Sequence, residues 1–442
     1  MATLGSRPAG DSVRFIVPPL YADNPMLDQT GRNFHNIKIV NRANEKVSVS
    51  FDSIRTGNIT SMTFAFAARE VPVRISYHVT LNYATQRDYM GIPAVSATGG
   101  WIRGAHLFIV PYTSPGLIDI WRTSFDLEVF WDIADELVLL GDPQQVAFDN
   151  PYQLLFSMSA IIDRSEANTR ILSQRTANGQ AFRFVSIEPT ISIDSDLARR
   201  IADDFAEIVG DLSASFGTID NAPLTVILRG ANKGGLEGMY AFTQLDPPHI
   251  DSLDVFNMVL AHELAHAWVG VRTGDVDMPW WKEGTATYLG YLIAKRNEVA
   301  ALPPVIDELV TQNYSGRDEV KKYKLTDEYA RVNLFEEGAS FGKLIYMKGA
   351  QVNMLLDTRI MQATAGNSTL DEVIGPFVQQ HEGGAFSWSE YREHIERESG
   401  ADIGDIYHNF IDATGAVPLD TLKQAFNWMA KSGAWGIADT LP

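Results

Sequence analysis

The feature that most constrains this chain is the run His-Glu-Leu-Ala-His at residues 262–266, which lies inside a stretch of helical periodicity. Asp251 is placed to cap the start of a helix over residues 252–274. Its buried stripe is predicted to consist of Val255, Phe256, Val259, Leu260, Leu264 and Ala267. On such a helix His262 and His266 lie one turn apart and point in the same direction. Two imidazoles in this geometry can share one tetrahedral zinc ion, with Zn–N distances of ~2.0–2.1 Å.

The glutamate between the two histidines indicates which reaction this run could catalyse. Glu263 is next to the first candidate ligand, so it cannot approach the metal from the same angle. It can reach a water bound to the metal, which is the position of a general base in metal-assisted hydrolysis. The pattern His-Glu-x-x-His on a helix is typical of zinc peptidases. In isolation it is also typical of a surface helix with two ordinary histidines.

A third protein ligand is required if the fourth position on the zinc is left to water. The run Trp-Trp-Lys-Glu-Gly-Thr-Ala-Thr-Tyr at residues 280–288 supplies Glu283 as the candidate. Pro279 suits the first turn of a second helix. The short connector at 271–278 lets that helix fold back against the first one.

These two runs together resemble known enzymes. His-Glu-Leu-Ala-His-Ala-Trp followed by Trp-x-Glu-Gly-x-Ala-x-Tyr is similar to the gluzincin aminopeptidases, the M1 and M61 families of zinc metallopeptidases. The resemblance implies one zinc ion per chain, with His262, His266 and Glu283 as metal ligands and Glu263 as catalytic base. Sixteen residues separate His266 from Glu283, fewer than in the M1 pattern, and the resemblance is closer to M61.

A glycine-rich segment upstream extends the resemblance. Gly-Gly-Leu-Glu-Gly at residues 234–238 resembles the Gly-Gly-Leu-Glu-His segment of M61 and stands in the place of Gly-Ala-Met-Glu-Asn in M1. The resemblance implies that Gly234 and Gly235 line the substrate cleft and that Glu237 binds the free α-amino group of the substrate. An anchor at a fixed distance from the zinc would present only the first peptide bond for hydrolysis. Alone, the segment is typical of a turn before an edge strand, and Gly238 departs from M61.

A later motif supplies a candidate for stabilising the transition state. Tyr-Met-Lys-Gly at residues 346–349 resembles the Tyr-x-Lys-Gly motif of M1 and its M61 counterpart. The resemblance implies that the Tyr346 hydroxyl donates a hydrogen bond to the oxyanion, a contribution of about 3–4 kcal/mol. The alternative is a core tyrosine, and Tyr323 and Tyr329 are further candidates for the role.

Period-two hydrophobic patterning predicts the architecture of the first part of the chain. Short runs of this kind, separated by turn residues, predict an N-terminal all-β domain over residues 13–170, a β-sandwich or saddle-like sheet. Residues 1–12 lack the apolar core of a signal peptide and are predicted to be a disordered tail. The lone histidines of this domain are predicted to be structural residues rather than ligands, namely His35, His78 and His106.

The rest of the chain is predicted to be α+β and then helical. A polar, turn-rich stretch at 164–180 marks the first domain boundary. A strand, an amphipathic helix and a second strand then lead into the metal helix, which resembles the first half of a thermolysin-like zinc catalytic domain, here at 181–300. Residues 301–442 are predicted to be the C-terminal helical part of the catalytic unit. An M61 enzyme usually adds a PDZ domain, for which no room is expected here.

Composition excludes several classes of partner. With a net charge of −19 the chain is a poor candidate for binding nucleic acid or an anionic membrane surface. Without cysteine it can form neither a disulfide nor a thiolate metal site. No run approaches the ~20 apolar residues of a membrane span. The cytoplasm remains possible, as does a periplasmic or secreted location with the signal segment absent from this sequence, and no oligomeric state is predicted.

The sequence therefore predicts a zinc-dependent aminopeptidase that hydrolyses the first bond of peptides with a free N-terminus. One alternative is that the same zinc hydrolase scaffold acts as an endopeptidase, or on a non-peptide amide or epoxide. A second alternative is a non-catalytic binding protein that uses its β domain. The presence of Glu263 beside a complete ligand set argues against the second alternative, because a binding protein needs no base.

Overall fold

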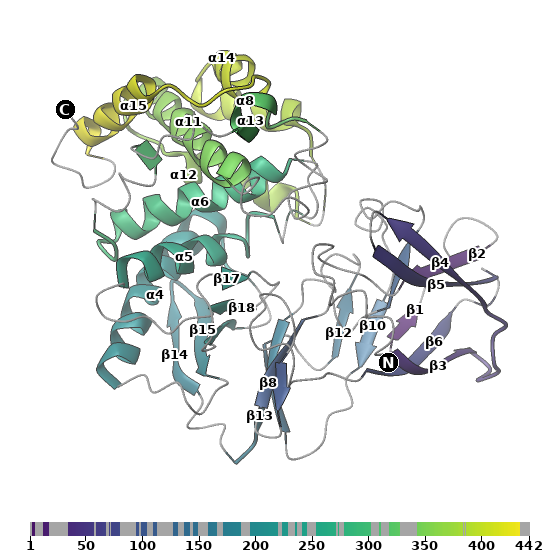
Figure 1. Cartoon of the computed structure of the whole chain (residues 1–442). Coiled ribbons are helices and arrows are strands. Elements are labelled where there is room, and N and C mark those ends of the chain that lie inside the picture. Colours follow the sequence, from purple (N-terminus) through teal and green to yellow (C-terminus); the bar gives the residue numbers. More distant parts are fainter. Residues whose placement is uncertain are drawn as a thin grey trace. The chain divides into compact units, whose positions relative to one another are not determined.

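The protein structure is a computed structural model, and its internal contacts divide the chain into two units. One unit is formed by residues 1–174, 182–192 and 221–247 and is rich in strands; the other is formed by residues 175–181, 193–220 and 248–442 and is rich in helices (Figure 1). The residues that the structure describes are 2–4, 12–16, 34–56, 59–67, 70, 72–79, 94–96, 99–103, 109–112, 127–130, 137–141, 145–148, 158–165, 171–186, 195–219, 223–228, 235–236, 241–244, 253–270, 273, 278–301, 309–310, 318–327, 343–382, 384 and 386–433.

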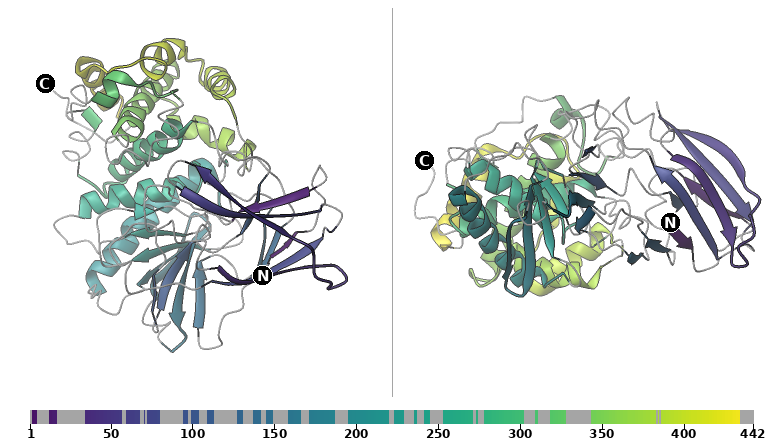
Figure 2. Two further views of the ribbon diagram at one scale, coloured as in Figure 1. Left: turned by 45° about the vertical axis from the view of Figure 1, so that its right-hand side comes forward. Right: turned by 90° about the horizontal axis from the view of Figure 1, so that it is seen from below.

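Two antiparallel sheets form the N-terminal part of the first unit. The five-stranded sheet has the order β12-β10-β1-β6-β3, formed by β12 (Gln145–Phe148), β10 (Leu127–Phe130), β1 (Ala2–Leu4), β6 (Val73–Val79) and β3 (Phe34–Asn41). The four-stranded sheet has the order β4-β5-β2-β9, formed by β4 (Ser50–Thr56), β5 (Ile59–Ala67), β2 (Ser12–Ile16) and β9 (Val110–Tyr112). Their purple and dark blue ribbons lie together in both views of Figure 2.

These two sheets share one apolar core, which gives them the packing of a β-sandwich. The core residues alternate along their strands because successive side chains of a strand point to opposite faces. They are Phe34, Ile39, Val73 and Ile75 from one sheet and Phe15, Phe64 and Phe66 from the other, with Val47 and Ile109 beside them. The rings of Phe15 and Phe64 stack at a centroid distance of 5.2 Å. The prediction of a β-rich N-terminal region is therefore confirmed, and the all-β domain over residues 13–170 stays a prediction.

The prediction of a disordered N-terminal tail is wrong. Ala2–Leu4 form a strand between β10 and β6, with Thr3 opposite Glu128 on one side and Arg74 on the other. The partner strands lie about seventy or more residues away in sequence. A three-residue strand carries almost no periodicity of its own, so its pairing depends on these distant partners.

Two further sheets are formed by the remaining strands, most of whose residues belong to the first unit. One has the order β11-β13-β8-β7, formed by β11 (Leu137–Gly141), β13 (Met158–Asp163), β8 (Gly99–Arg103) and β7 (Ala94–Ser96). The other has the order β14-β15-β16-β18-β17, formed by β14 (Ile171–Ala177), β15 (Gln180–Ser186), β16 (Leu224–Leu228), β18 (Ala241–Gln244) and β17 (Gly235–Leu236). Here β15, β16 and β18 are parallel. All five residues of β16 are buried, as expected for a central strand of a parallel sheet.

The second unit is helical. Its elements are α4 (Ser195–Phe216), α5 (Leu253–Ala265), α6 (Pro279–Arg296), α8 (Asp318–Lys322), η7 (Lys343–Lys348), α11 (Gly349–Ala363), α12 (Leu370–Gln380), α13 (Trp388–Ser399), α14 (Gly404–Ile406), η8 (Tyr407–Ile411) and α15 (Leu419–Ser432). The predicted apolar face of α4 is buried at Leu197, Ile201, Phe205, Ile208 and Leu212. Both α6 and α11 are buried around most of their circumference, which places them in the interior of the unit. Within the described ranges, no helix is both long and apolar enough to span a bilayer.

Candidate metal centre

Helix α5 carries His262, the turn after it carries His266 and helix α6 carries Glu283, and the two helices lie against each other (Figure 1). α5 ends at Ala265, so His266 occupies the turn that follows, where its backbone N–H still bonds to the carbonyl of His262 at 3.4 Å. α6 begins at Pro279, as the sequence predicts. The fixed φ of proline and its missing N–H suit this first helical position.

A glycine on α6 allows the two helices to approach closely at the first histidine. A Cβ atom added at Gly290 would lie 3.0 Å from the backbone nitrogen of His262 and 3.0 Å from the carbonyl oxygen of Met258. Both distances are too short for ordinary contacts, so any larger side chain would push α6 away from α5. Because Gly290 has no side chain, α6 can pack directly against the turn of α5 that carries His262.

The three candidate ligand atoms converge. The Nε2 atoms of His262 and His266 are 3.2 Å apart, and the Oε2 atom of Glu283 lies 3.8 Å from the first and 3.1 Å from the second. Donors on a tetrahedral zinc ion with ~2.0–2.1 Å bonds are ~3.3 Å apart. Among the described residues, this is the single group of three or more histidine or acidic side chains close enough to hold a metal ion together.

Hydrogen bonds on the far side of each imidazole fix which nitrogen faces the centre. The Nδ1 atom of His266 lies 3.1 Å from the carbonyl oxygen of Val269, which can only accept, so Nδ1 carries the proton. The hydroxyl of Thr287 donates to the carbonyl of Glu283 at 2.7 Å and therefore accepts from Nδ1 of His262 at 3.2 Å. Both neutral imidazoles thus present the lone pair of Nε2 to the centre.

This arrangement fits a bound cation. Two nitrogen lone pairs and a carboxylate oxygen repel one another at 3.1–3.8 Å unless a positive charge lies among them. Nitrogen and carboxylate oxygen are the donors that zinc accepts, and three protein ligands are typical of a catalytic zinc site. His262, His266 and Glu283 are therefore the residues that would hold the metal.

The charge of Glu283 suits this task. The side chain is buried, which by itself would raise the pKa of the carboxyl group, but attraction by His266, whenever that ring is protonated, and by the ammonium group of Lys282 outweighs burial. The pKa of Glu283 is accordingly held well below its usual range. The group is a carboxylate at neutral pH and has electrons to share with a cation.

The predicted base lies on α5, the helix that carries His262. Glu263 follows His262 in α5 and is buried, with 7% of its surface exposed. Successive residues of a helix point about 100° apart, so the carboxylate leaves the helix in a different direction from the His262 ring. The position agrees with the role predicted for it, which stays a prediction.

Tyr346 lies beside the candidate ligands. It belongs to η7, and its ring stacks on the imidazole of His262 with a centroid distance of 5.8 Å and an interplanar angle of 27°. The structure thus places the Tyr-Met-Lys-Gly motif at residues 346–349 beside the His-Glu-Leu-Ala-His run at residues 262–266. Of the two other candidates, Tyr323 follows α8 and Tyr329 lies outside the described residues.

Two glycines explain how η7 comes so close to α6. A Cβ atom at Gly284 would lie 2.6 Å from the backbone of Gly349, and a Cβ atom at Gly349 would lie 2.8 Å from the carbonyl oxygen of Trp280 and 2.9 Å from the Cα of Gly284. The helices therefore touch backbone to backbone at this point. Gly284 follows Glu283 directly, and Gly349 closes the motif that begins at Tyr346.

The lysine of the same motif has a structural partner that the sequence did not reveal. Lys348 is buried, and its Nζ donates to the carbonyl oxygen of Ala413 at 2.7 Å. Burial lowers the pKa of this ammonium group to about 8. Lys348 thus ties the junction of η7 and α11 to the segment between η8 and α15.

The predicted substrate residues are described only in part. Gly234 and Glu237 lie outside the described residues. Gly235 begins β17 and pairs with Gln244 of the antiparallel strand β18. The prediction that these residues line the substrate cleft therefore stays a prediction.

The lone histidines of the β-sandwich behave as ordinary strand residues where the structure describes them. His35 and His78 sit opposite each other in β3 and β6, and both are exposed. The Nδ1 of His78 lies 3.2 Å from the side-chain amide of Asn36. His106 lies outside the described residues.

Sequence analysis missed the groups that orient the two imidazoles. Thr287, one turn after Glu283, lacks the carboxylate that often follows a zinc-binding glutamate, but its hydroxyl accepts the proton of His262 instead. His266 is oriented by a backbone carbonyl, that of Val269, which no sequence motif marks. Such outer hydrogen bonds fix the tautomer and the direction of a metal-binding histidine.

Comparison with known proteins agrees with this geometry. Residues 245–410 match the profile of the domain described as "Peptidase family M1 domain". This stretch includes α5, α6, η7 and all three candidate ligands. No curated protein sequence matches the chain.

Several solved structures of hydrolytic enzymes have a similar fold. An aminopeptidase N family protein from Idiomarina loihiensis has a TM-score of 0.67 at 14% identity, with 96% of this chain and 75% of that chain covered. The M1 zinc metallopeptidase of Deinococcus radiodurans has a TM-score of 0.56 at 15% identity, covering 94% and 90%. Yeast LTA4 hydrolase in complex with bestatin has a TM-score of 0.51 at 12% identity, covering 95% and 66%. At identities this low the likeness concerns the fold, a β-rich N-terminal region followed by a helical C-terminal region.

The profile match and the ligand geometry together establish the class of protein. It is a zinc metallopeptidase, a hydrolase whose cofactor is Zn²⁺. The sequence prediction of a zinc-dependent hydrolase is confirmed at this level.

Proposed function

We propose that the protein is an aminopeptidase that removes the first residue from peptides with a free α-amino group. The observation that carries the proposal is the convergence of His262, His266 and Glu283 beside the ring of Tyr346. The names of the structural neighbours support it, since one is an aminopeptidase N family protein and another is a zinc metallopeptidase seen with a Tyr-Ser-Ala substrate.

Each residue of the site has a distinct task in this proposal. Zinc held by the three ligands supplies a Lewis acid that polarises the scissile carbonyl and makes the attacking water more acidic. Glu263 accepts a proton from that water and passes it to the leaving amine. The Tyr346 hydroxyl donates a hydrogen bond to the oxygen on which negative charge develops. Thr287 and the carbonyl of Val269 keep the imidazoles in the tautomer that offers Nε2.

Substrate selection in this proposal depends on the Gly-Gly-Leu-Glu-Gly segment. Gly234 and Gly235 let the substrate backbone approach closely. Glu237 binds the substrate ammonium group and so places the first carbonyl at the metal. The finer assignments belong to the same proposal: a closer relation to M61 than to M1, a thermolysin-like catalytic domain over residues 181–300 and a helical part after it.

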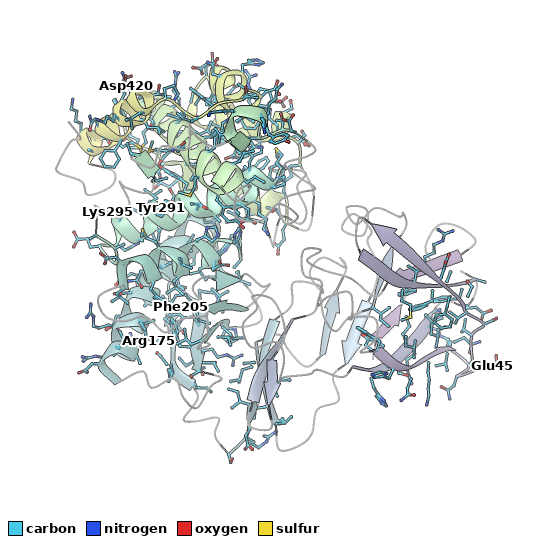
Figure 3. The ribbon with its side chains drawn as sticks, viewed as in Figure 1. Glu45, Arg175, Phe205, Tyr291, Lys295 and Asp420 are labelled. Carbon is cyan, nitrogen blue, oxygen red and sulfur yellow. The ribbon has the colours of Figure 1, made fainter. Side chains whose placement is uncertain are left out.

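Replacing Glu237 tests whether the enzyme is an aminopeptidase. Breaking a desolvated charge pair from one side costs on the order of 2–5 kcal/mol. Glu237→Ala should therefore cleave an aminoacyl anilide several hundredfold more slowly than the parent, with part of the loss in kcat because the anchor positions the scissile carbonyl. Its zinc content, measured by elemental analysis, should stay the same. The matched control is Glu45→Ala, which removes an exposed acid of the same β-rich unit (Figure 3) and should leave the rate unchanged.

The parent enzyme should not cleave the N-acetylated form of the same anilide, because that form lacks the cation. Equal cleavage of blocked and free substrates would exclude the amine anchor and make the site that of an endopeptidase. A zinc-loaded parent that cleaves neither anilides nor peptides would favour a non-peptide substrate, such as an epoxide.

A further inference from the structure

Lys282 makes the two oxygens of the Glu283 carboxylate unequal. Oε2 of Glu283 faces the imidazoles, at 3.1 Å from Nε2 of His266. Oε1 of the same carboxylate lies 3.3 Å from the ammonium nitrogen of Lys282. One oxygen therefore points to the candidate metal position, and the other is engaged by a cation of the chain.

The position of Lys282 is built into the backbone. A Cβ atom added at Gly270 would lie 2.6, 2.8 and 2.9 Å from Cγ, Cε and Cδ of Lys282, so the aliphatic stem of the lysine crosses bare backbone. Gly270 has a φ of +109°, a conformation that side chains disfavour, and its N–H donates to the hydroxyl of Thr273 at 3.1 Å. Only 17% of the Lys282 side chain is exposed. A lysine held in this way differs from a mobile surface ion pair.

The number of oxygens that Glu283 offers matters for catalysis. A carboxylate can bind a metal ion with one oxygen or with both. A catalytic zinc site needs three protein ligands and one open position. If both oxygens of Glu283 coordinated the ion, the second oxygen would crowd that open position.

We propose that Lys282 is a positioning residue that occupies Oε1 of Glu283, so that the zinc ion takes Oε2 alone. This inference rests on the proposed ligand set of His262, His266 and Glu283. The positive charge of Lys282 also opposes the metal ion, so the site holds its zinc less tightly than the same three ligands would without the lysine. Lys282 thus keeps an open position on the metal and lowers the affinity of the site.

The expected sign of the affinity change separates this role from a purely structural one. If Lys282 only supported the position of Glu283, its removal would weaken zinc binding, as the loss of a supporting contact usually does. If it repels the ion and blocks an oxygen, its removal would strengthen zinc binding. Even at the dielectric constant of water, repulsion between one lysine charge and a doubly charged ion a few ångströms away lowers the binding constant of the ion about tenfold.

The test compares Lys282→Met with Lys282→Arg, which keeps the cation, and with the control Lys295→Met near the other end of α6 (Figure 3). Zinc affinity is measured by competition with a chromogenic chelator. The coordination number is measured from the visible absorption of the cobalt(II)-substituted proteins, because four-coordinate cobalt absorbs more strongly than five-coordinate cobalt. Thermal unfolding checks that every variant is folded.

Lys282→Met should bind zinc about tenfold more tightly than the parent and show the weaker cobalt absorption of a five-coordinate ion. Lys282→Arg and Lys295→Met should resemble the parent in both measurements. An unchanged cobalt spectrum in Lys282→Met, or zinc affinity equal to or below that of the parent, would overturn the proposal while leaving the ligand set intact. A His262→Ala protein with the parent's cobalt spectrum would overturn the ligand set itself, and this inference with it.

Discussion

Helix α6 carries a cluster of buried and half-buried charged side chains at each end, and the two clusters balance their charge in different ways. At the C-terminal end, Arg296 donates to both carboxylate oxygens of Asp211 at 2.6 and 2.8 Å and to Asp371 at 2.9 Å. Asn297 donates to Asp211 and Ser215 donates to Asp371. Burial alone would raise the pKa of Asp371, but Arg296 reverses the shift and holds that pKa below its usual range.

At the N-terminal end of the helix, the polar atoms that face the candidate metal position are all electron donors. His262, His266 and Glu283 present two lone pairs and a carboxylate oxygen to one point, and the protons of both imidazoles are used on the outer side. The first cluster is complete within the chain, whereas the second is completed by an ion. The comparison teaches that a buried acid indicates a metal site only when its neighbours offer lone pairs in place of N–H groups.

The sharpest test of this difference is to remove a ligand. His262→Ala should lose both zinc and measurable peptidase activity, because two remaining ligands cannot hold a catalytic zinc ion. Its thermal unfolding should be compared with that of the metal-free parent, since both lack the ion. Stoichiometric zinc in the purified His262→Ala protein, measured by elemental analysis, would contradict the site.

A smaller loss should follow when the ligands are kept and the base is changed. Glu263→Gln should retain one zinc ion per chain, since no ligand is altered, but turnover should fall by about 10³-fold because proton transfer is lost. The measurement is kcat on an aminoacyl anilide together with the zinc content of the same sample. Activity within tenfold of the parent would mean that another group accepts the proton.

At the C-terminal end of α6 we expect a substitution to lower stability and to leave the zinc content unchanged. Arg296→Met leaves the buried Asp371 and the half-buried Asp211 without their cation and should lower the free energy of unfolding by about 3 kcal/mol, measured by urea denaturation. Zinc per folded chain should not change, because this cluster is complete without the ion. The control is Arg199→Met, which breaks an exposed pair with Asp196 on α4 and should change stability by less than about 1 kcal/mol. Loss of zinc in Arg296→Met would show that the two clusters are not independent.

The sequence predicts the metal site well where local spacing decides the geometry. His262 and His266 are one helical turn apart, and the position of α6 follows from Pro279 and a short connector. Burial of the α4 face at Ile201 and Phe205 was also predictable, because periodicity belongs to the helix itself.

The remaining features depend on segments that meet only in the folded chain. The hydroxyl of Thr287 accepts the imidazole proton of His262 because the α5–α6 contact brings the two side chains together. The carbonyl of Val269 faces His266 because the chain turns after Ala265. The strand at Ala2–Leu4 was missed for the same reason, since its register depends on distant partners.

The contact between Gly284 and Gly349 has a mechanical consequence. Where two helices meet through side chains, their separation varies with the rotamers and thermal motion of those side chains. Here the separation is set by the radii of backbone atoms, which have no rotamers. The contact therefore acts as a rigid stop between the helix of Glu283 and the helical turn of Tyr346, and the spacing of these two residues should be insensitive to repacking of the surrounding core.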